Sequence, residues 1–135
     1  MSDAEKNNGK KAEKSQLIAK KREARECVFS ILFEMTFTNE QYKDIVDKAI
    51  EARTLELSDF AADLLEYFSA NQELVDGYIK SNIKGWKFER VSRVALSVMR
   101  LALTEILSTD TSASIIINEA VEMTKNMPIK KHHLS

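Results

Sequence analysis

The sequence contains very few of the residues that end helices or build tight turns. Its 135 residues include three glycines and one proline. Alternating runs of Val, Ile and Thr, which are typical of strands, are also missing. These absences leave little material for β-turns. The sequence therefore predicts an all-α fold of helices joined by short loops, in one domain, because the chain is too short to make two domains the expectation.

A second absence concerns export and membrane insertion. The single cysteine, Cys27, cannot form an internal disulfide, which fits a reducing compartment. The N-terminus is charged and lacks the apolar stretch of a signal peptide. No apolar run is long enough to span a bilayer. These features predict a cytoplasmic location and no membrane association.

The groups that carry catalysis or bind metals are also scarce. The only histidines, His132 and His133, are adjacent in a basic tail, and no Cys, His or Asp residues occur at ligand spacing. Cys27 lies in a helical apolar stripe, which favours a small buried hydrophobe over a nucleophile. The three glycines are scattered, so no phosphate-binding loop is present. We expect a protein that is not an enzyme and has neither cofactor nor metal.

What the sequence does contain is helical periodicity. Ser58 is a candidate N-cap for a helix that continues through Gly77, a weak point within it. Residues 82–87 form a predicted loop around Gly85. Residues 1–14 are polar and predicted to be a disordered or loosely helical extension. Residues 15–126 form the predicted helical domain, and residues 127–135 a basic tail. Apolar residues at helical spacing predict helices over 15–37, 39–52, 58–79, 91–107 and 115–126.

Basic residues cluster near the N-terminus although the net charge is only −1. A local cluster of this kind is typical of a phosphate-contacting surface, and a solvated helix face is the alternative reading. Arg25 also flanks the apolar stripe, so a structural ion pair is the alternative for this residue. The cluster consists of Lys10, Lys11, Lys14, Lys20, Lys21, Arg22 and Arg25.

A second basic group surrounds the only tryptophan, Trp86. Basic groups mixed with an aromatic ring can hold phosphates and stack a base. A single tryptophan is more often a packing anchor, and both readings stay open. The basic residues of this group are Lys80, Lys84, Lys87 and Arg90.

Four segments stand in a fixed order along the chain: KREARECVFSILFEM (21–35), LLEYFSANQELVDGYIK (64–80), WKFERVSRVALSVMRLALTEIL (86–107) and IIINEAVEMTK (115–125). The first places Ala24, Arg25 and Glu26 between a basic cluster and an apolar stripe. The last contains the most diagnostic run, Ile-Asn-Glu-Ala-Val-Glu at 117–122. In this order and spacing the segments resemble the NusB family of transcription antitermination proteins, and the resemblance covers about residues 15–126.

The resemblance implies a fold of two small antiparallel helical bundles packed together. It also implies binding to the boxA element of ribosomal RNA transcripts, together with NusE, a small-subunit ribosomal protein, in an antitermination complex with RNA polymerase. On this view Lys20, Lys21 and Arg22 contact the RNA backbone. Arg25, at helical spacing from Lys21 and Arg22, is the fourth residue that we predict at this RNA-binding surface. Lys80 and Lys84 extend the surface.

Other matching residues have a structural alternative, and the function has alternatives too. Arg100, Glu105, Asn118 and Glu119 match the family pattern, and ion pairs or helix caps within the bundle explain them equally. One alternative function is an RNA-recruiting domain like that of a ribosomal RNA methyltransferase, which resembles NusB. Another is a helical protein-interaction or dimerisation module without an RNA role.

The chain departs from the family pattern in two places. Ala95 and Leu96 stand where the family commonly has charged residues, which puts that part of a NusE contact in doubt. After Lys125 the family continues into an acidic loop and a final helix, whereas this chain has a basic tail.

We hypothesise that a single-base deletion produced the tail. A DNA sequence that encodes Met127–Ser135, with freely chosen third bases, encodes Tyr-Ala-Asp-Lys-Glu-Ala-Pro-Ser-Phe when it is read in the shifted frame. These are residues that the family resemblance leads us to expect at this place. The coding DNA tests this hypothesis. An ordinary basic tail, with Pro128 ending the helix, is the alternative. Loss of the final helix would expose an apolar face and predicts lower stability, a homodimer or dependence on a partner.

Overall fold

The computed structural model describes residues 3–52 and 55–126, and within these ranges the chain is entirely helical. This confirms the predicted all-α class. A short 3-10 helix over Phe88–Arg90 precedes α5. The α-helices are α1 (Asp3–Met35), α2 (Tyr42–Glu51), α3 (Asp59–Ala70), α4 (Gln72–Asn82), α5 (Arg93–Ser108) and α6 (Ala113–Lys125).

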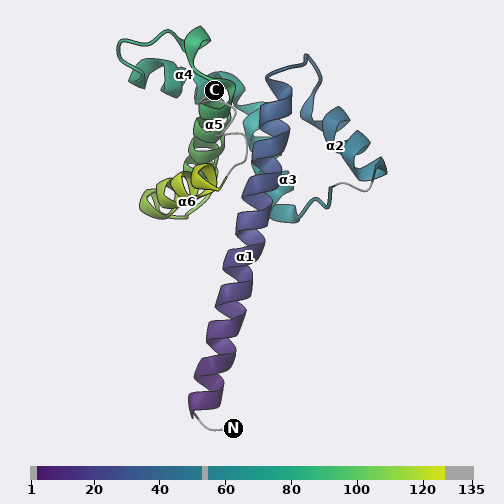
Figure 1. Ribbon diagram of the computed structural model, residues 1–135, viewed down its shortest axis with the longest axis vertical. Coiled ribbons are helices and arrows are strands. Elements are labelled where there is room, and N and C mark those ends of the chain that lie inside the picture. The colour runs from purple at the N-terminus through teal and green to yellow at the C-terminus, as the bar shows by residue number, and fades with distance from the viewer. Residues whose placement is uncertain (1–2, 53–54, 127–135) are drawn as a thin grey trace.

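The long helix α1 and helix α5 form the centre of the body and run antiparallel. Arg25 of α1 contacts Glu105 near the end of α5, while Arg93 at the start of α5 donates to the carbonyl of Thr36, just after α1. Helices α2 and α3 pack against α1, and α4 and α6 pack against α5. In Figure 1, α2 lies to the right of α1, and α4, α5 and α6 lie to its left. Helix α3 packs on α5 as well as on α1 and joins the two sides.

An apolar core lies where α1, α2, α3, α4 and α5 meet. The first residues of α3 and α5 are fixed by serines: Ser58 accepts a hydrogen bond from the backbone N–H of Ala61, and Ser92 accepts one from that of Ala95. Both serines satisfy N–H groups that a helix start leaves unpaired. The largest fully buried apolar side chains are Val28, Leu32, Leu64, Leu65, Phe68 and Val75.

Two element boundaries differ from the predictions. The predicted helix over 58–79 is two helices, because α3 ends at Ala70 and α4 begins at Gln72. Asn71 separates them, and its side-chain amide donates to the carbonyl of Tyr67. A side-chain bond to the backbone competes in this way with continuation of the helix. The apolar periodicity crosses the break and therefore conceals it.

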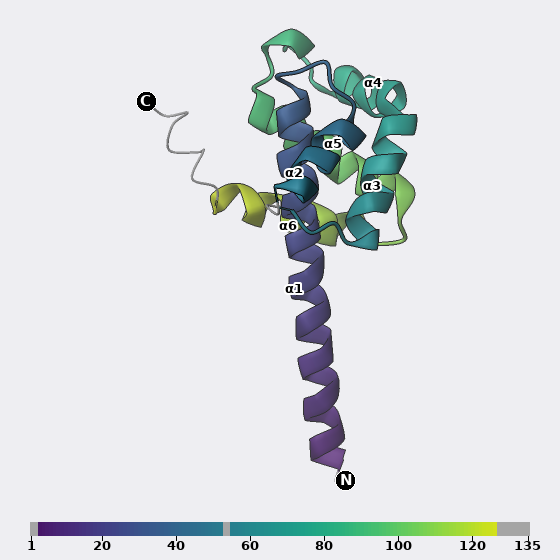
Figure 2. The ribbon, with the colours of Figure 1, turned by 90° about the vertical axis from the view of Figure 1, so that its right-hand side faces the viewer.

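Helix α1 is also longer than predicted. Residues 3–14, predicted to be disordered or loosely helical, are the first turns of α1. All side chains of residues 3–20 are exposed. Both views show this part of α1 extending alone beyond the body (Figures 1 and 2). We refer to residues 3–20 as the projecting segment.

Candidate nucleic-acid interface

The second half of the predicted basic cluster, Lys20 to Arg25, lies where α1 enters the body, whereas Lys10, Lys11 and Lys14 lie in the projecting segment. Lys20 is exposed and ends the projecting segment, and Lys21 contacts another helix. The ammonium group of Lys21 lies 5.4 Å from the ring centre of Phe60, near the start of α3. A cation over an aromatic face is favourable. This contact directs Lys21 along the side of α1 that faces α3.

Arg22 is exposed and bonded to α6 at the same time. Its Nε and Nη2 atoms donate to the two carboxylate oxygens of Glu119 at 2.9 and 3.1 Å. The side chain of Arg22 is 56% exposed and that of Glu119 only 13%. The hydrogen bonds and charge of Arg22 lower the pKa of Glu119 below its ordinary value. Arg22 therefore has solvent-facing N–H groups left for an anion, while its other N–H groups join α1 to α6.

Arg25 lies one turn further along α1 and is buried. Its Nε and Nη2 atoms donate to both carboxylate oxygens of Glu105 at 2.7 Å. The Glu105 side chain is 1% exposed, and the hydrogen bonds that Arg25 donates to this carboxylate raise the pKa of Arg25. The guanidinium of Arg25 is therefore bound in a bidentate ion pair inside the fold. The arrangement agrees with the structural alternative for Arg25.

Of the other residues for which a structural role was the alternative, three form ion pairs between helices and one is exposed. Arg100 donates from Nε and Nη2 to Asp76 of α4 at 2.9 and 2.8 Å, and both side chains are largely buried. Arg100, Glu105 and Glu119 are therefore ion-pair partners between helices. Asn118 is exposed on α6.

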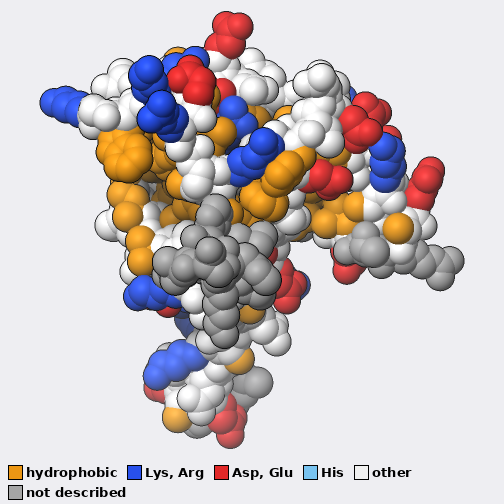
Figure 3. Space-filling view, turned by 45° about the horizontal axis from the view of Figure 1, so that its top comes forward, with side chains coloured by type: hydrophobic (Ala, Val, Ile, Leu, Met, Phe, Trp, Pro, Cys, Tyr) orange, Lys and Arg blue, Asp and Glu red, His pale blue; other side chains and the backbone are white. Residues whose placement is uncertain are grey.

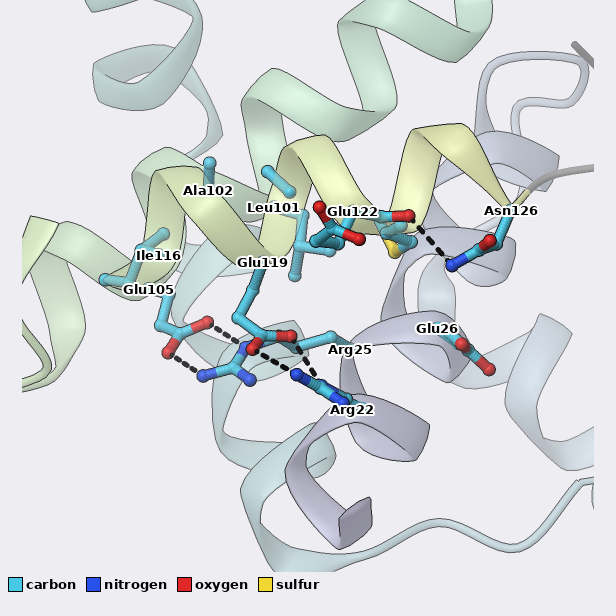
Figure 4. Close-up of a pocket in the computed structure, with 12 residues that line it drawn as sticks. Arg22, Arg25, Glu26, Leu101, Ala102, Glu105, Ile116, Glu119, Glu122 and Asn126 are labelled. Carbon is cyan, nitrogen blue, oxygen red and sulfur yellow. Dashed lines mark hydrogen bonds and ion pairs between the residues drawn. The ribbon is translucent and has the colours of Figure 1, made fainter. Parts of the chain in front are cut away.

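A pocket lies beside these ion pairs, between α1, α5 and α6. Its volume is about 120 Å³, and Figure 4 shows Glu105 and Glu119 directed toward Arg25 and Arg22 across it. Leu101 and Ile116 contribute apolar surface to its lining. Both arginines that line the pocket are already paired with carboxylates. The pocket is therefore a junction between helices and not a site for a charged ligand.

The second predicted basic group lies at the other end of the body. Lys80 lies over the ring of Phe88, 4.7 Å from its centre, and the 3-10 helix that contains Phe88 leads into α5. The start of α5 contacts the end of α1 through Arg93. From Arg22 to that end of α1 the helix rises about 20 Å. The structure therefore does not bring Lys80 and the exposed Lys84 together with the basic cluster on α1.

Trp86 is 71% exposed in the loop before α5. It is not a packing anchor, although a single tryptophan more often has that role. Gly85 beside it has a φ of +79°, a conformation that glycine adopts without strain. In Figure 3 the Lys and Arg side chains on the visible face of the body are interspersed with Asp and Glu side chains, and hydrophobic side chains lie exposed between them.

The described residues provide no arrangement for chemistry on a substrate. Burial raises the pKa of the Cys27 thiol, which disfavours the reactive thiolate. Among the described residues no group of three or more His, Cys, Asp or Glu side chains is placed to hold a metal ion. His132 and His133 lie outside the described residues, as does the rest of the predicted tail. No helix within the described ranges is both long enough and apolar enough to cross a membrane.

One surface was not found from the sequence. Helix α6 exposes Ile115, Ile117 and Val121, which are 53, 55 and 45% exposed. The periodicity indicated an apolar stripe on this helix, and the sequence predicted an exposed apolar face where a final helix is lost without placing that face on α6. A count of apolar positions could have signalled it, because α6 has more of them than one buried face uses. Ile117 and Val121 are one turn apart and therefore adjacent on the helix surface.

Known proteins are similar in sequence to this chain over most of its length. The NusB family model matches residues 22–133. The chain is 31% identical over 116 residues to the transcription antitermination protein NusB of Sulfurovum sp. (strain NBC37-1), covering 84% of this chain and 89% of that protein. It is 34% identical over 110 residues to the protein of the same name from Sulfurimonas denitrificans, covering 80 and 83%. The chain therefore belongs to the NusB family.

Proposed function

We propose that this protein is an RNA-binding transcription antitermination factor, which binds boxA-type RNA of ribosomal RNA transcripts together with NusE and acts in the antitermination complex with RNA polymerase. Its relatives carry the name transcription antitermination protein. The observation that carries the RNA-binding part is the group of at least partly exposed basic residues Lys20, Lys21 and Arg22 on α1, in a chain whose net charge is −1. The protein acts by binding and not by catalysis.

The RNA backbone contacts Lys20, Lys21 and Arg22 in this proposal. The two lysines are at least partly exposed and have no ion-pair partner among the described residues; Arg22 keeps N–H groups on the solvent side of its bond to Glu119. Arg25 is left out of the contact set, because its guanidinium is buried against Glu105. Backbone contacts of this kind position the protein and carry no sequence information.

Lys80 and Lys84 form a separate contact group for a different part of the same RNA. Lys84 is two residues before Trp86 in the same loop, and the ring of Trp86, which is 71% exposed, is accessible to a base. The rise of about 20 Å along α1 corresponds to about six nucleotides of a stacked strand, so different nucleotides contact the two groups.

NusE docks on the exposed apolar side of α6 in this proposal. Ile117 and Val121 supply apolar surface, and exposed apolar groups of this kind are typical of protein interfaces. Helix α6 is bonded to the basic cluster through Glu119 and Arg22. The protein-binding and RNA-binding surfaces are therefore neighbours, which fits joint recognition of RNA by two proteins.

The RNA surface is tested with the variant Lys21→Ala/Arg22→Ala and a matched control. The variant removes two phosphate contacts, so the slope of log affinity against log salt falls by about 0.7 for each contact with a single strand. The variant also removes the Arg22–Glu119 ion pair. The control Glu119→Gln weakens the same ion pair and keeps Arg22. We expect weaker RNA binding for the variant and not for the control; equal loss in both would mean that Arg22 acts through the fold.

A further inference from the structure

The projecting segment of α1 lies outside the part of the chain that matches the NusB family. The family match begins at Arg22, whereas α1 begins at Asp3. The helix is continuous across this point and carries the projecting segment away from the body (Figures 1 and 2). An exposed helix of this length has no core contacts to stabilise it. Its surface is therefore available for a ligand that the family match does not describe.

The basic residues of this segment lie on one side of the helix. With 3.6 residues per turn, Lys10, Lys14 and Lys21 fall within about 40° of one another around the axis. We refer to these three residues as the basic face. Glu5 and Glu23 fall on the opposite side, at about 160° from Lys21. Asp3 shares the angle of Lys21 at the start of the helix, and Glu13 lies about 80° from Lys21. The basic face is therefore the stretch of this side from Lys10 to Lys21, where no acidic residue lies within about 60° of Lys21.

Two of the three lysines of the basic face have no acidic neighbour at helical spacing, whereas Lys10 has Glu13 three positions away. Residues three and four positions away are neighbours on a helix and stabilise it when their charges are opposite. Around Lys14 these positions hold Lys10, Lys11, Leu17 and Ile18. Around Lys21 they hold Leu17, Ile18, Ala24 and Arg25. Neither lysine has an acidic neighbour in its own helix, and like charges at this spacing destabilise it. A bound anion would remove that repulsion.

The basic face points to the same side as the core. Val28 and Leu32, both fully buried, fall at the same angular positions around α1 as Lys10 and Lys14. The basic face therefore continues the line along which α1 packs on the body. Lys21 belongs to both parts, since it lies over Phe60 at the start of α3. A strand bound at the basic cluster can follow this line without leaving the surface of α1.

We propose that the basic face of α1 is an additional binding surface for the phosphate backbone of RNA, which lengthens the segment of RNA that the protein holds. This inference rests on the proposed RNA-binding function. From Lys10 to Lys21 the helix rises about 16 Å. That length corresponds to about four or five nucleotides of a stacked strand, at ~3.4 Å each. Leu17 and Ile18, 56 and 40% exposed, lie between the lysines and contact the less polar sugars and bases.

The test measures affinity for a boxA-type RNA and for the same RNA extended by five uridines at its 5′ or 3′ end. The full chain gains affinity from one of the extensions. The variant Lys10→Gln/Lys14→Gln loses this gain, and its salt slope on the extended RNA falls by about 1.4, or 0.7 for each of two contacts. Its affinity for the unextended RNA stays within twofold. Circular dichroism checks that the helix is retained, since Lys and Gln have similar helix propensities.

A charge-matched variant separates a helical face from a merely charged segment. It combines Lys10→Gln and Lys14→Gln with Ala12→Lys and Gln16→Lys, so that the same charge stands on the opposite side of α1. We expect this variant to stay as weak on the extended RNA as the double variant. Recovery of the gain in this variant, or no gain from either extension in the full chain, overturns the proposal. If the unextended RNA does not bind at all, the proposed function fails and this proposal with it.

Discussion

Two arginines one turn apart on α1 have opposite environments, and the environment decides their role. Arg25 is bonded to a carboxylate that is 1% exposed, whereas the Arg22 side chain is 56% exposed. Their spacing in the sequence makes them look equivalent. The difference comes from what lies opposite on α5 and α6, about 80 and 97 positions away in the chain. The sequence offered a structural ion pair as the alternative for Arg25 alone, because Arg25 flanks the apolar stripe, and could not decide between the two readings.

The buried pair gives a prediction about stability. Replacing Glu105 by Gln keeps the shape of the side chain and leaves the buried charge of Arg25 without its partner. We expect the free energy of unfolding to fall by about 3–5 kcal/mol, as for other buried pairs that lose one partner. Urea denaturation measures it. Glu122→Gln, which removes an exposed pair with Lys125, is the control and changes stability by about 1 kcal/mol or less. A small loss in Glu105→Gln would contradict the assigned role.

The Arg22–Glu119 pair gives a prediction about pH. The pKa of Glu119 in the folded protein is lowered, so its pair contributes stability above the ordinary glutamate value of about 4.3. That contribution disappears as the pH falls through the lower folded pKa, because the carboxylate becomes protonated. We expect the difference in unfolding free energy between the wild type and Glu119→Gln to be present at pH 6 and to vanish as the pH is lowered toward 3. A difference that stays constant over this range would show that the charge of Glu119 is not involved.

At the scale of the elements, serines at three helix starts offer a matched comparison. Ser92 caps α5 with its side chain, whereas Ser112 at the start of α6 makes no side-chain hydrogen bond to the helix backbone. We expect Ser92→Ala to cost about 1 kcal/mol of unfolding free energy and Ser112→Ala clearly less. Thermal or urea denaturation of both variants measures this. Equal losses would mean that the cap of α5 does not act through its hydrogen bond.

The elements also show how far sequence reasoning reaches. Apolar periodicity predicted the helical regions of the body, because burial of one stripe imposes the spacing. It missed the break at Asn71, where a side-chain hydrogen bond ends α3 without interrupting the apolar pattern. It also predicted a disordered or loosely helical start for a segment that forms the first turns of α1. That segment has no buried residue, so no apolar pattern marks it.

At the scale of the whole molecule, charged and apolar surfaces are arranged around α1 and α6. The basic cluster and the exposed apolar side of α6 adjoin through one ion pair, while Lys80 and Lys84 lie at the other end of the body. Family resemblance suggested a single basic surface. The spacing along the sequence could not show that the antiparallel course of α1 and α5 separates the two basic groups.

The apolar side of α6 gives a prediction about the protein partner. Ile117→Ser/Val121→Ser replaces two exposed apolar side chains by polar ones, so the fold should be unaffected. We expect RNA binding by the protein alone to be unchanged and the gain in RNA affinity on adding NusE to be lost. Loss of that gain without any change in unfolding free energy assigns α6 to the interface. An unchanged gain would place NusE elsewhere on the molecule.

The most direct test of the proposed function is a titration of fluorescently labelled boxA-type RNA with the protein. It is carried out with and without NusE, at 50 and 200 mM salt, beside an RNA of equal length and scrambled sequence. We expect affinity for the boxA-type RNA to rise when NusE is present, to exceed that for the scrambled RNA, and to fall with salt as phosphate contacts require. No binding in any of these conditions, or binding that neither NusE nor the RNA sequence changes, would contradict a role as a boxA-binding antitermination factor.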